Sequence, residues 1–427
     1  MFLDEMIAAQ KRGEARGVAS VCSAHPTVLN VAIKQALRAL ESHGALLIEA
    51  TCNQVNQFGG YTGMKPADFV RYVHGIAKEN KLPFEYILLG GDHLGPSVWQ
   101  DEPAESAMQK SAELVRDYVG AGFTKIHFDS SMRLADDPAG RLDAEVSARR
   151  AAQLAKIAEQ TAITSGGGAP RYVIGTEVPV PGGARERGDS VGITTVENAR
   201  QTIEVTREAF RREGLESAWE RVIAVVVEPG VEFGDDFVWA YQPSATRELS
   251  RFIEWQPMVY EAHSTDYQRR QALKSLVRDH FAILKVGPGL TFAFREAVFA
   301  LAMMEDELFP ANMRSHLIRV LDYVMVRHPR YWQKYYLGTP DVQAFKRKFS
   351  FSDRARYYWP DPHVQNALDI LLRNLNDKPL PFSLLSQYAP MEMEKIRAGM
   401  IENKADAIIS DHVSRVLDDY VFACGGN

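Results

Sequence analysis

Two histidines and one glutamate, His93, Glu228 and His263, each follow a short apolar stretch of this chain. Two imidazoles and a carboxylate form a ligand set suited to Zn²⁺ or a similar divalent ion, with coordination positions left open for a substrate. For any one histidine, the alternative is a structural side chain whose nitrogens are satisfied within the fold. Because the three residues stand at the ends of separate predicted strands, we expect them to meet and bind one metal ion.

Two further acidic residues are candidates for proton transfer. Asp92 immediately precedes His93 in LLGGDHLGP, so the alternation of a β-strand predicts that their side chains diverge. A carboxylate beside a metal-bound substrate can move a proton on a hydroxyl or on a carbon next to a carbonyl. The alternative role is to orient a metal ligand. Glu177, in YVIGTEVPVPGG, suits a base, a ligand or an acceptor for a substrate hydroxyl, whereas His127 is interpreted as structural.

The stretch KVGPGLTFAFREA leads from glycines directly into a predicted helix. Free backbone N–H groups and the positive end of a helix suit a phosphate, although an ordinary turn before a helix is the alternative. The preceding loop, HSTDYQRR, adds hydroxyl groups and a nearby carboxylate at Asp266. The predicted phosphate-binding residues are Ser264, Thr265, Lys285, Gly287 and Gly289.

The segment TCNQVNQFGGYTGM carries four amide side chains, at positions 53, 54, 56 and 57. Uncharged donors and acceptors suit sugar hydroxyls, and the following Gly59-Gly60-Tyr61 could form a mobile cover. A solvated loop is the alternative. We expect Asn53 and Gln54 to contact the substrate.

Eight short apolar runs provide the strands that position these side chains. Turn residues bound each run, and segments with apolar residues at helical spacing, such as 107–121 and 196–213, separate them. Such runs are typical of buried parallel strands. The predicted strands are Gly17–Cys22, Ala45–Ala50, Tyr86–Gly91, Thr124–Asp129, Tyr172–Glu177, Val222–Glu228, Met258–His263 and Ala282–Gly287.

Eight strand–helix units in series predict an α/β fold, a (β/α)8 TIM barrel, over a doubly wound open sheet. The strand ends favour the barrel, because barrel enzymes place catalytic groups at the carboxyl ends of several strands. Nearly every strand here ends in an ionisable residue, including Glu49 and Asp129, whose roles stay open together with that of Cys52. Clustered charges at a rim cost desolvation energy, so they indicate a function.

The chain continues well beyond the eighth unit. We predict a barrel over residues 1–306 and a C-terminal helical extension over residues 307–427. The extension has helical patterns in RSHLIRVLDYVMV and NALDILLRNL, which the aromatic-rich strings KYYL and RYYWP interrupt. We expect it to pack on the barrel, to form a surface for a partner, or both.

The composition narrows the class of protein. The 427 residues are 46% hydrophobic and 24% charged, with a net charge of −6. These values favour neither nucleic acid nor an anionic membrane as a partner. Three scattered cysteines without a CxxC motif favour a reducing cytoplasm over a disulfide framework. No apolar run is long enough to span a bilayer, and the oligomeric state stays open, with a homo-oligomer as one option.

Several long strings resemble the GatZ/KbaZ family, whose members are called D-tagatose-1,6-bisphosphate aldolase subunits. The resemblance extends from about Val18 to the C-terminal region. The strings are ATCNQVNQFGGYTGM, GGDHLGP, IGTEVPVPGG, PGVEF, YEAHSTDYQ, RDHFAILKVGP and RYYWP. The family is similar to class II, zinc-dependent ketose-bisphosphate aldolases, which are (β/α)8 barrels.

The resemblance implies roles for particular residues. In the class II aldolases an Asp-His pair ends the third strand; the histidine binds metal and the aspartate shuttles protons. Asp92 matches that aspartate, and His93 and His263 match metal ligands. At the sixth strand this chain has Glu228 where the aldolases have a histidine.

The resemblance also leaves two functions open. Some family members are described as non-catalytic partners that stabilise a separate aldolase chain, and others as D-tagatose 6-phosphate 4-epimerases. We favour the second function, a metal-dependent epimerase of phosphorylated ketohexoses that opens and re-forms the C3–C4 bond by retro-aldol chemistry, in galactitol or tagatose catabolism. The alternatives are the stabilising subunit and an aldolase that acts alone. A kinase label also exists in the family, but this sequence has no GxxxxGK[ST] loop.

Overall fold

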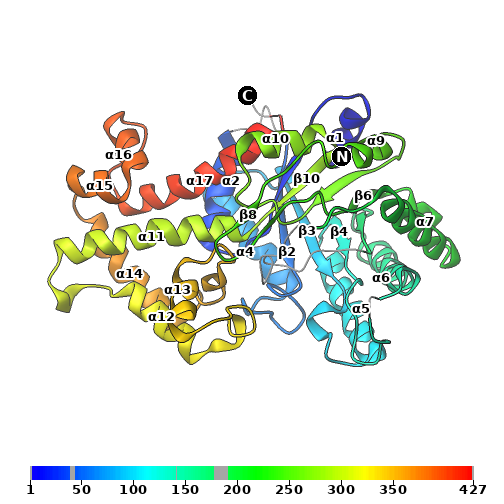
Figure 1. The fold of residues 1–427 in the computed structure, drawn as a ribbon, viewed down its shortest axis with the longest axis horizontal. Helices are drawn as coiled ribbons and strands as arrows, with labels where there is room; N and C mark the ends of the chain where they lie inside the picture. The colour runs from blue at the N-terminus through cyan, green and yellow to red at the C-terminus, as the bar shows by residue number, and fades with distance from the viewer. Residues whose placement is uncertain (1, 39–43, 141, 177–190, 426–427) are drawn as a thin grey trace.

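Eight parallel strands close into a barrel, so the predicted (β/α)8 TIM-barrel fold is confirmed (Figure 1). The computed structural model describes residues 2–38, 44–140, 142–176 and 191–425. Each barrel strand overlaps one of the eight predicted runs. In order around the barrel the strands are β1 Val18–Val21, β2 Leu46–Thr51, β3 Ile87–Leu94, β4 Lys125–Phe128, β5 Arg171–Ile174, β6 Val222–Val226, β9 Val259–Ala262 and β10 Phe281–Val286. A separate antiparallel hairpin, β7 Glu232–Phe233 and β8 Val238–Trp239, follows β6.

The helices that surround the barrel include both of the helices predicted from periodicity, at α5 and α7. Polar caps start several of them; the Thr195 hydroxyl, for example, accepts a hydrogen bond from the Asn198 N–H at the start of α7. The helices up to the end of the barrel are α1 Phe2–Lys11, α2 Pro26–Arg38, α4 Pro66–Glu79, α5 Ala104–Gly120, α6 Ala144–Ser165, α7 Val196–Arg212, α8 Glu216–Trp219, α9 Arg247–Glu254, α10 Arg270–Arg278 and α11 Pro288–Leu308.

Helix α1 closes the end of the barrel at which the strands begin. Its Leu3 and Met6 belong to one buried apolar cluster with Val18, Leu47 and Val259, which lie at or next to the start of their strands. Burying an apolar side chain of this size stabilises the fold by roughly 1.5–3 kcal/mol. Apolar side chains thus fill this end, and the ionisable residues lie at the other.

The chain beyond α11 is helical, as predicted. Figure 1 shows α11 reaching away from the barrel, α12 to α14 below it, α15 and α16 above its far end, and α17 returning toward the barrel. The bounds are α12 Leu317–Arg327, α13 Pro340–Phe349, α14 Pro362–Asn376, α15 Phe382–Tyr388, α16 Pro390–Arg397 and α17 Ala405–Ala423, with the short 3-10 helix η5 at Arg354–Tyr357.

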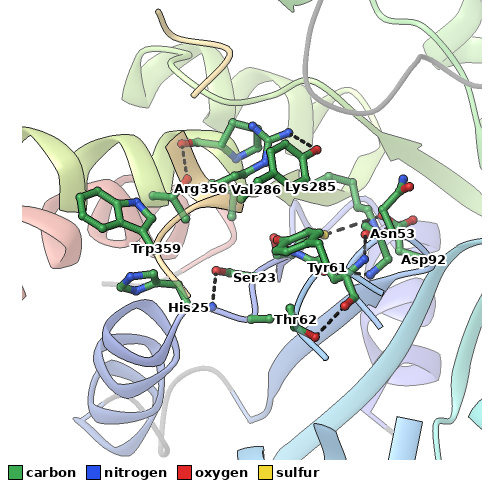
Figure 2. Close-up of a pocket in the computed structure, with 18 of the residues that line it drawn as sticks. Ser23, His25, Asn53, Tyr61, Thr62, Asp92, Lys285, Val286, Arg356 and Trp359 are labelled. Atoms are coloured by element: carbon green, nitrogen blue, oxygen red, sulfur yellow. Dashed lines mark hydrogen bonds and ion pairs between the residues drawn. The ribbon is translucent and has the colours of Figure 1, made fainter. Parts of the chain in front are cut away.

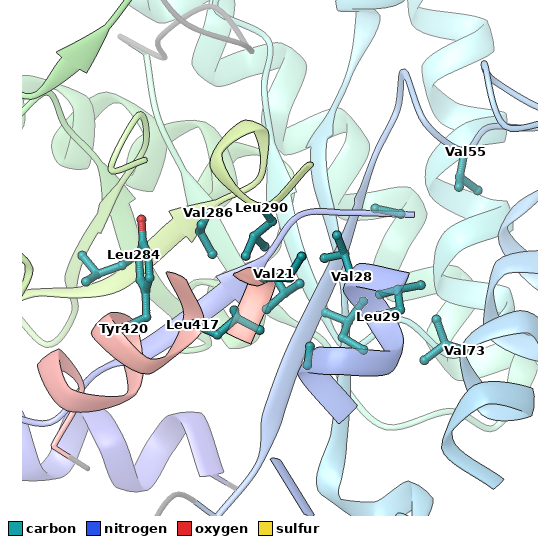
Figure 3. Packing of buried hydrophobic residues seen from close by; sticks show 14 of the residues in the cluster. Val21, Val28, Leu29, Val55, Val73, Leu284, Val286, Leu290, Leu417 and Tyr420 are labelled. Atoms are coloured by element: carbon teal, nitrogen blue, oxygen red, sulfur yellow. The ribbon is translucent and has the colours of Figure 1, made fainter. Parts of the chain in front are cut away.

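Helix α17 packs on the barrel itself, against β1, α2, α10 and α11. Figure 3 shows its Leu417 and Tyr420 beside Val21, Leu284 and Val286 of the barrel wall. The barrel and the extension therefore share one apolar core, and their division into two units at residue 306 stays a prediction. Within the described ranges, no helix has the length and apolar character needed to cross a membrane.

Candidate active site

A cavity of about 430 Å³ opens where the barrel strands end. Its walls come from the segments after β1, β2, β9 and β10, from β3, and from residues 356–365 of the extension. Figure 2 shows Asp92 and Asn53 at one side of the cavity and His25 and Trp359 at the other. Of the site residues predicted from the sequence, those that line the cavity are Asn53, Gln54, Asp92, His93, His263, Ser264, Lys285 and Gly287.

Three imidazoles meet at the barrel end of this cavity. The ring centres of His93, His127 and His263 lie 4.9 to 5.2 Å from one another. One potential ligand atom from each ring and one from Asp92 all lie within 4.8 Å of one another, and the four residues are buried. This cluster could hold a metal ion. It contains two of the predicted ligands, together with His127, which the sequence pattern had indicated to be structural.

Each imidazole rests against a carboxylate. The pairs are His93 Nδ1 with Asp129 Oδ2 at 2.8 Å, His127 Nδ1 with Asp92 Oδ1 at 2.8 Å, and His263 Nε2 with Glu261 Oε1 at 3.0 Å. A ring nitrogen that donates its proton to a carboxylate leaves the other nitrogen free to bind a metal, and metal-binding histidines commonly have such a partner. The free nitrogen of His127, Nε2, is buried and has no hydrogen-bond partner among the described residues. An unsatisfied buried nitrogen is costly, so this donor set fits a divalent transition metal.

An irregularity in β3 turns both Asp92 and His93 into the barrel. The expectation that their side chains diverge is wrong, because both contribute to the cluster. The pairing of β3 with β4 shifts register between Gly91 and Leu94, and His93 has a φ of 50°, in the left-handed region. A bulge of this kind places two successive side chains on one side of a strand, which is how an acid and an imidazole adjacent in sequence reach the same centre.

Two glycines make room for the cluster. A Cβ on Gly90 would lie 2.7 Å from Cγ of Glu49, and a Cβ on Gly95 would lie 1.9 Å from the carbonyl oxygen of Asp129. Both distances are below van der Waals contact, so a larger residue would push the neighbouring strand away. The glycines of LLGGDHLGP thus allow β2 and β4 to approach β3 closely.

We expect the Gly95→Ala substitution to destabilise the fold by roughly 1–3 kcal/mol, as overpacking does, because backbone rather than a flexible side chain stands in the way. Urea unfolding measures this change. The control is Gly75→Ala in α4, where a Cβ meets nothing within 4 Å. That variant should be as stable as the native chain or more so, by about 0.4–1 kcal/mol. Equal stabilities of the two variants would contradict the prediction.

Below the histidines, a buried network of charges fills the barrel. Lys125 Nζ lies 2.5 Å from both Glu49 and Glu261, and its side chain is fully buried. Lys285 Nζ lies 2.8 Å from Asp92 and also contacts Glu49 and Glu261. With Asp129 added, four carboxylates face two ammonium groups, which leaves a net charge of −2 when the imidazoles are neutral. Uncompensated buried charge is unfavourable, and a divalent cation would balance this excess.

The electrostatics keep Asp92 ionised. Burial by itself raises its pKa, but the electrostatic influence of the adjacent His93 ring and of the Lys285 ammonium, together with the hydrogen bond with His127, outweighs burial. The pKa of Asp92 therefore lies well below its ordinary value. An ionised carboxylate at the cavity wall can accept a proton from a bound hydroxyl.

The glycines after β10 already have an anionic partner. The N–H groups of Gly287 and Gly289 donate to Asp266 Oδ1 over 3.0 and 2.7 Å. Thr265 is fully buried, and its hydroxyl donates to the backbone carbonyl of Lys285. Burial raises the pKa of Asp266 to about 6 although the two N–H groups lower it. Of the predicted phosphate contacts, Ser264, Lys285 and Gly287 line the cavity, whereas Thr265 and Gly289 do not.

One predicted metal ligand, Glu228, stands apart from the cluster. Glu228 lies two residues beyond β6, is half-buried, and donates its backbone N–H to the Thr194 hydroxyl. No potential metal group within the described ranges includes it. Glu177 lies outside the described residues, as does the whole of the following VPVPGG segment.

The extension supplies cavity residues that the sequence pattern did not assign. Arg356, Tyr357 and Trp359, from the RYYWP string, line the cavity opposite the barrel. The Tyr357 ring lies 4.6 Å from that of Tyr61, in the loop after β2, so this loop and the extension meet over the site. The sequence feature that marks these cavity residues is an arginine followed by a run of aromatic residues, RYYWP.

Comparisons with known proteins agree with this architecture. Residues 3–425 match the family described as D-tagatose-1,6-bisphosphate aldolase subunit GatZ/KbaZ-like. Proteins named D-tagatose-1,6-bisphosphate aldolase subunit GatZ, from Salmonella paratyphi B and Salmonella typhimurium, are each 53% identical over 422 residues, 99% of both chains.

A solved structure is also similar over nearly the whole chain. It is described as a probable tagatose 6 phosphate kinase from Sinorhizobium meliloti 1021 and is 45% identical, with a TM-score of 0.87 over 96% of this chain and 100% of that one. The family match and the level of identity hold from one end of the chain to the other. The chain therefore belongs to the D-tagatose-1,6-bisphosphate aldolase subunit GatZ/KbaZ-like family.

Proposed function

We propose that this chain is a metal-dependent enzyme that interconverts D-tagatose 6-phosphate and D-fructose 6-phosphate by inverting C4. The observation that carries the proposal is the cluster of three imidazoles, each backed by a carboxylate, of which His93 and His263 line the cavity. A chain that served only as a scaffold would have no need of such a cluster, which is costly to bury. The names of the relatives include tagatose phosphates, so we propose a tagatose phosphate as the substrate.

The cavity suits a sugar phosphate in size and in lining. Its volume of about 430 Å³ falls in the range typical of small-molecule sites. Asn53 and Gln54 both line it, but the Gln54 amide is already hydrogen-bonded to backbone groups of Thr51 and Cys22. Asn53 is thus the better of the two proposed contacts for a sugar hydroxyl.

The proposed metal ligands are His93, His127 and His263, with Zn²⁺ as the proposed ion. A bound divalent ion supplies Lewis-acid polarisation of the sugar carbonyl and the hydroxyl next to it. Glu228, the third ligand in the set proposed from the sequence, competes with His127 for this role, and metal binding by single variants separates the two sets.

In the proposed reaction, Asp92 accepts the proton of the C4 hydroxyl while the C3–C4 bond breaks, which yields an aldehyde at C4 and an enediolate on the other fragment. The aldehyde turns over within the cavity. The C3–C4 bond then re-forms on the opposite face, and Asp92 returns the proton to the oxygen at C4. Lys285, 2.8 Å from Asp92, holds this carboxylate in place. Glu177 stays an alternative proposed base.

The test is to incubate the purified chain with D-tagatose 6-phosphate and Zn²⁺ and to measure D-fructose 6-phosphate. We expect product from the native chain and none from His93→Ala. His316→Ala, at an exposed histidine of the extension that lies outside the cavity, is the control and should keep activity. Absence of product with the native chain and several divalent metals would refute the epimerase proposal.

A second candidate function is that of a subunit of a D-tagatose-1,6-bisphosphate aldolase. The relatives' names state this role directly and favour it over an epimerase. The extension also exposes large apolar side chains on α12 and α13, which are typical of an interaction surface. They include Tyr323, Val326, Phe345 and Phe349, between 49% and 57% exposed.

The subunit role predicts that Phe345→Ser combined with Phe349→Ser weakens binding to a class II aldolase chain by roughly 30-fold or more, as loss of central aromatic contacts does. Co-purification and calorimetry measure the change. Ile163→Ser, on α6 and 80% exposed, is the control and should bind as the native chain does. If the chain is a non-catalytic subunit, His93→Ala and His263→Ala should leave the partner's aldolase activity intact. Loss of that activity in either variant would contradict a purely structural role.

A further inference from the structure

The cavity has two cationic side chains with fixed positive charge along its described walls, Lys285 and Arg356. Three carboxylates surround Lys285, so its charge is already balanced. Within the described ranges, Arg356 forms no ion pair with a carboxylate. Its nearest acidic neighbours are otherwise engaged, because Asp353 pairs with Arg295 and Asp266 accepts two backbone N–H groups. Arg356 therefore brings an uncompensated positive charge to the cavity.

The guanidinium of Arg356 is held on one side and open on the other. Its Nη1 donates to the backbone carbonyls of Ser352 and Asp353 over 2.7 and 2.8 Å, and its Nη2 donates to the Tyr357 hydroxyl over 3.0 Å. These contacts use three of the five N–H bonds. No described residue accepts from Nε or from the second Nη2 hydrogen. Unused N–H groups of a guanidinium can donate to the oxygens of a phosphate.

The charge distribution also fixes where an anionic group can sit. At the barrel end of the cavity the Asp92 carboxylate lines the wall, and the ammonium group of Lys285 is already paired with carboxylates, so no cationic side chain there is left for a phosphate. Arg356 enters from the extension, on the wall that also carries Tyr357 and Trp359. A substrate with its reacting carbons at the histidines and its phosphate toward the extension would satisfy both ends.

We propose that Arg356 binds the phosphate of the substrate, so that the C-terminal extension, rather than the barrel, selects phosphorylated over unphosphorylated sugars. This inference rests on the proposed function for the identity of the sugar but not for the chemistry at C4. Ser264, which lines the same cavity, stays a proposed further contact. The glycine N–H groups predicted for this role are instead bonded to Asp266.

The test compares ligand binding by calorimetry in the zinc-loaded chain, with D-fructose 6-phosphate, D-fructose and inorganic phosphate as probes. We expect Arg356→Gln to weaken binding of D-fructose 6-phosphate at least about tenfold, because charge-assisted bidentate hydrogen bonds are lost. Binding of D-fructose should change less than twofold, and competition by inorganic phosphate should disappear. Arg356→Lys keeps the charge without the paired donors and should fall between the native chain and Arg356→Gln.

The matched control is Arg327→Gln, which removes another arginine of the extension that donates to a tyrosine, Tyr323, but lies on the surface away from the cavity. It should bind all three probes as the native chain does. An unchanged melting temperature and zinc content show that Arg356→Gln is folded. If Arg356→Gln does not fold, the loss of affinity in Arg356→Lys tests the inference instead. Equal weakening for fructose and its phosphate, or no binding of either phosphate-bearing probe by the native chain, would overturn the inference. If binding of the sugar phosphate depends on Arg356 but no epimerisation occurs, the inference about Arg356 stands and the epimerase proposal is refuted.

Discussion

Replacing His127 by phenylalanine is expected to remove the metal from the purified chain. Phenylalanine keeps most of the ring volume in the strand β4, whose residues are fully buried, but takes away the Nε2 atom, which has no hydrogen-bond partner in the described part of the chain. Changing a residue that hydrogen-bonds to a metal ligand typically weakens metal binding by about 10–100-fold. Removing a ligand itself should weaken metal binding by more than that. Zinc per chain after dialysis, and titration against a zinc buffer, measure the effect.

Two matched variants make this result decisive. Asp129→Asn changes only the carboxylate behind His93 and should weaken zinc binding by about 10–100-fold. Glu228→Gln alters the ligand proposed from the sequence and should leave zinc binding unchanged, since no potential metal group in the described part of the chain includes Glu228. Retention of zinc by His127→Phe together with its loss from Glu228→Gln would reverse the assignment.

The sequence predicted the barrel because its signals are local. Eight apolar runs with turn residues between them give eight strands, and the end of each run marks the end of the barrel where a site can form. His93 and His263 followed from that rule alone, and the structure brings them together. Charged residues inside apolar runs, such as Lys125 and Glu261, also carry information about the barrel interior. In a closed barrel such residues face a shared interior and must pair there.

The parts that could not be predicted depend on contacts between distant segments or on irregular backbone. The bulge at Asp92 and His93 reverses the ordinary alternation of a strand, and the apolar pattern of β3 does not reveal it. His127 was interpreted as structural because nothing local separates a ligand from a buried histidine. Arg356 reaches the cavity only because the helices of the extension fold back over the barrel, and no local pattern fixes that path.

Lys285→Met is expected to destabilise the fold by about 3–5 kcal/mol, the usual cost of leaving buried charges without their partner. The ammonium group of Lys285 contacts Glu49, Asp92 and Glu261, and its side chain is 7% exposed, so water cannot replace it. Methionine fills a similar volume without charge, which limits the effect of an empty cavity. Urea unfolding in the presence of a chelator measures the change without a contribution from bound metal.

Lys156→Met provides the comparison, because Lys156 pairs with Glu213 at 2.9 Å but has a side chain that is 47% exposed. Exposed ion pairs contribute only about 0–1 kcal/mol, so this variant should unfold close to the native chain. Combining Lys285→Met with Glu49→Gln should cost less than the sum of the two single changes, since the second substitution removes one of the carboxylates that the first leaves unpaired. If Lys285→Met were no less stable than Lys156→Met, the carboxylates around it would have to be protonated or hydrated, and the charge excess that favours a divalent cation at the histidines would be absent.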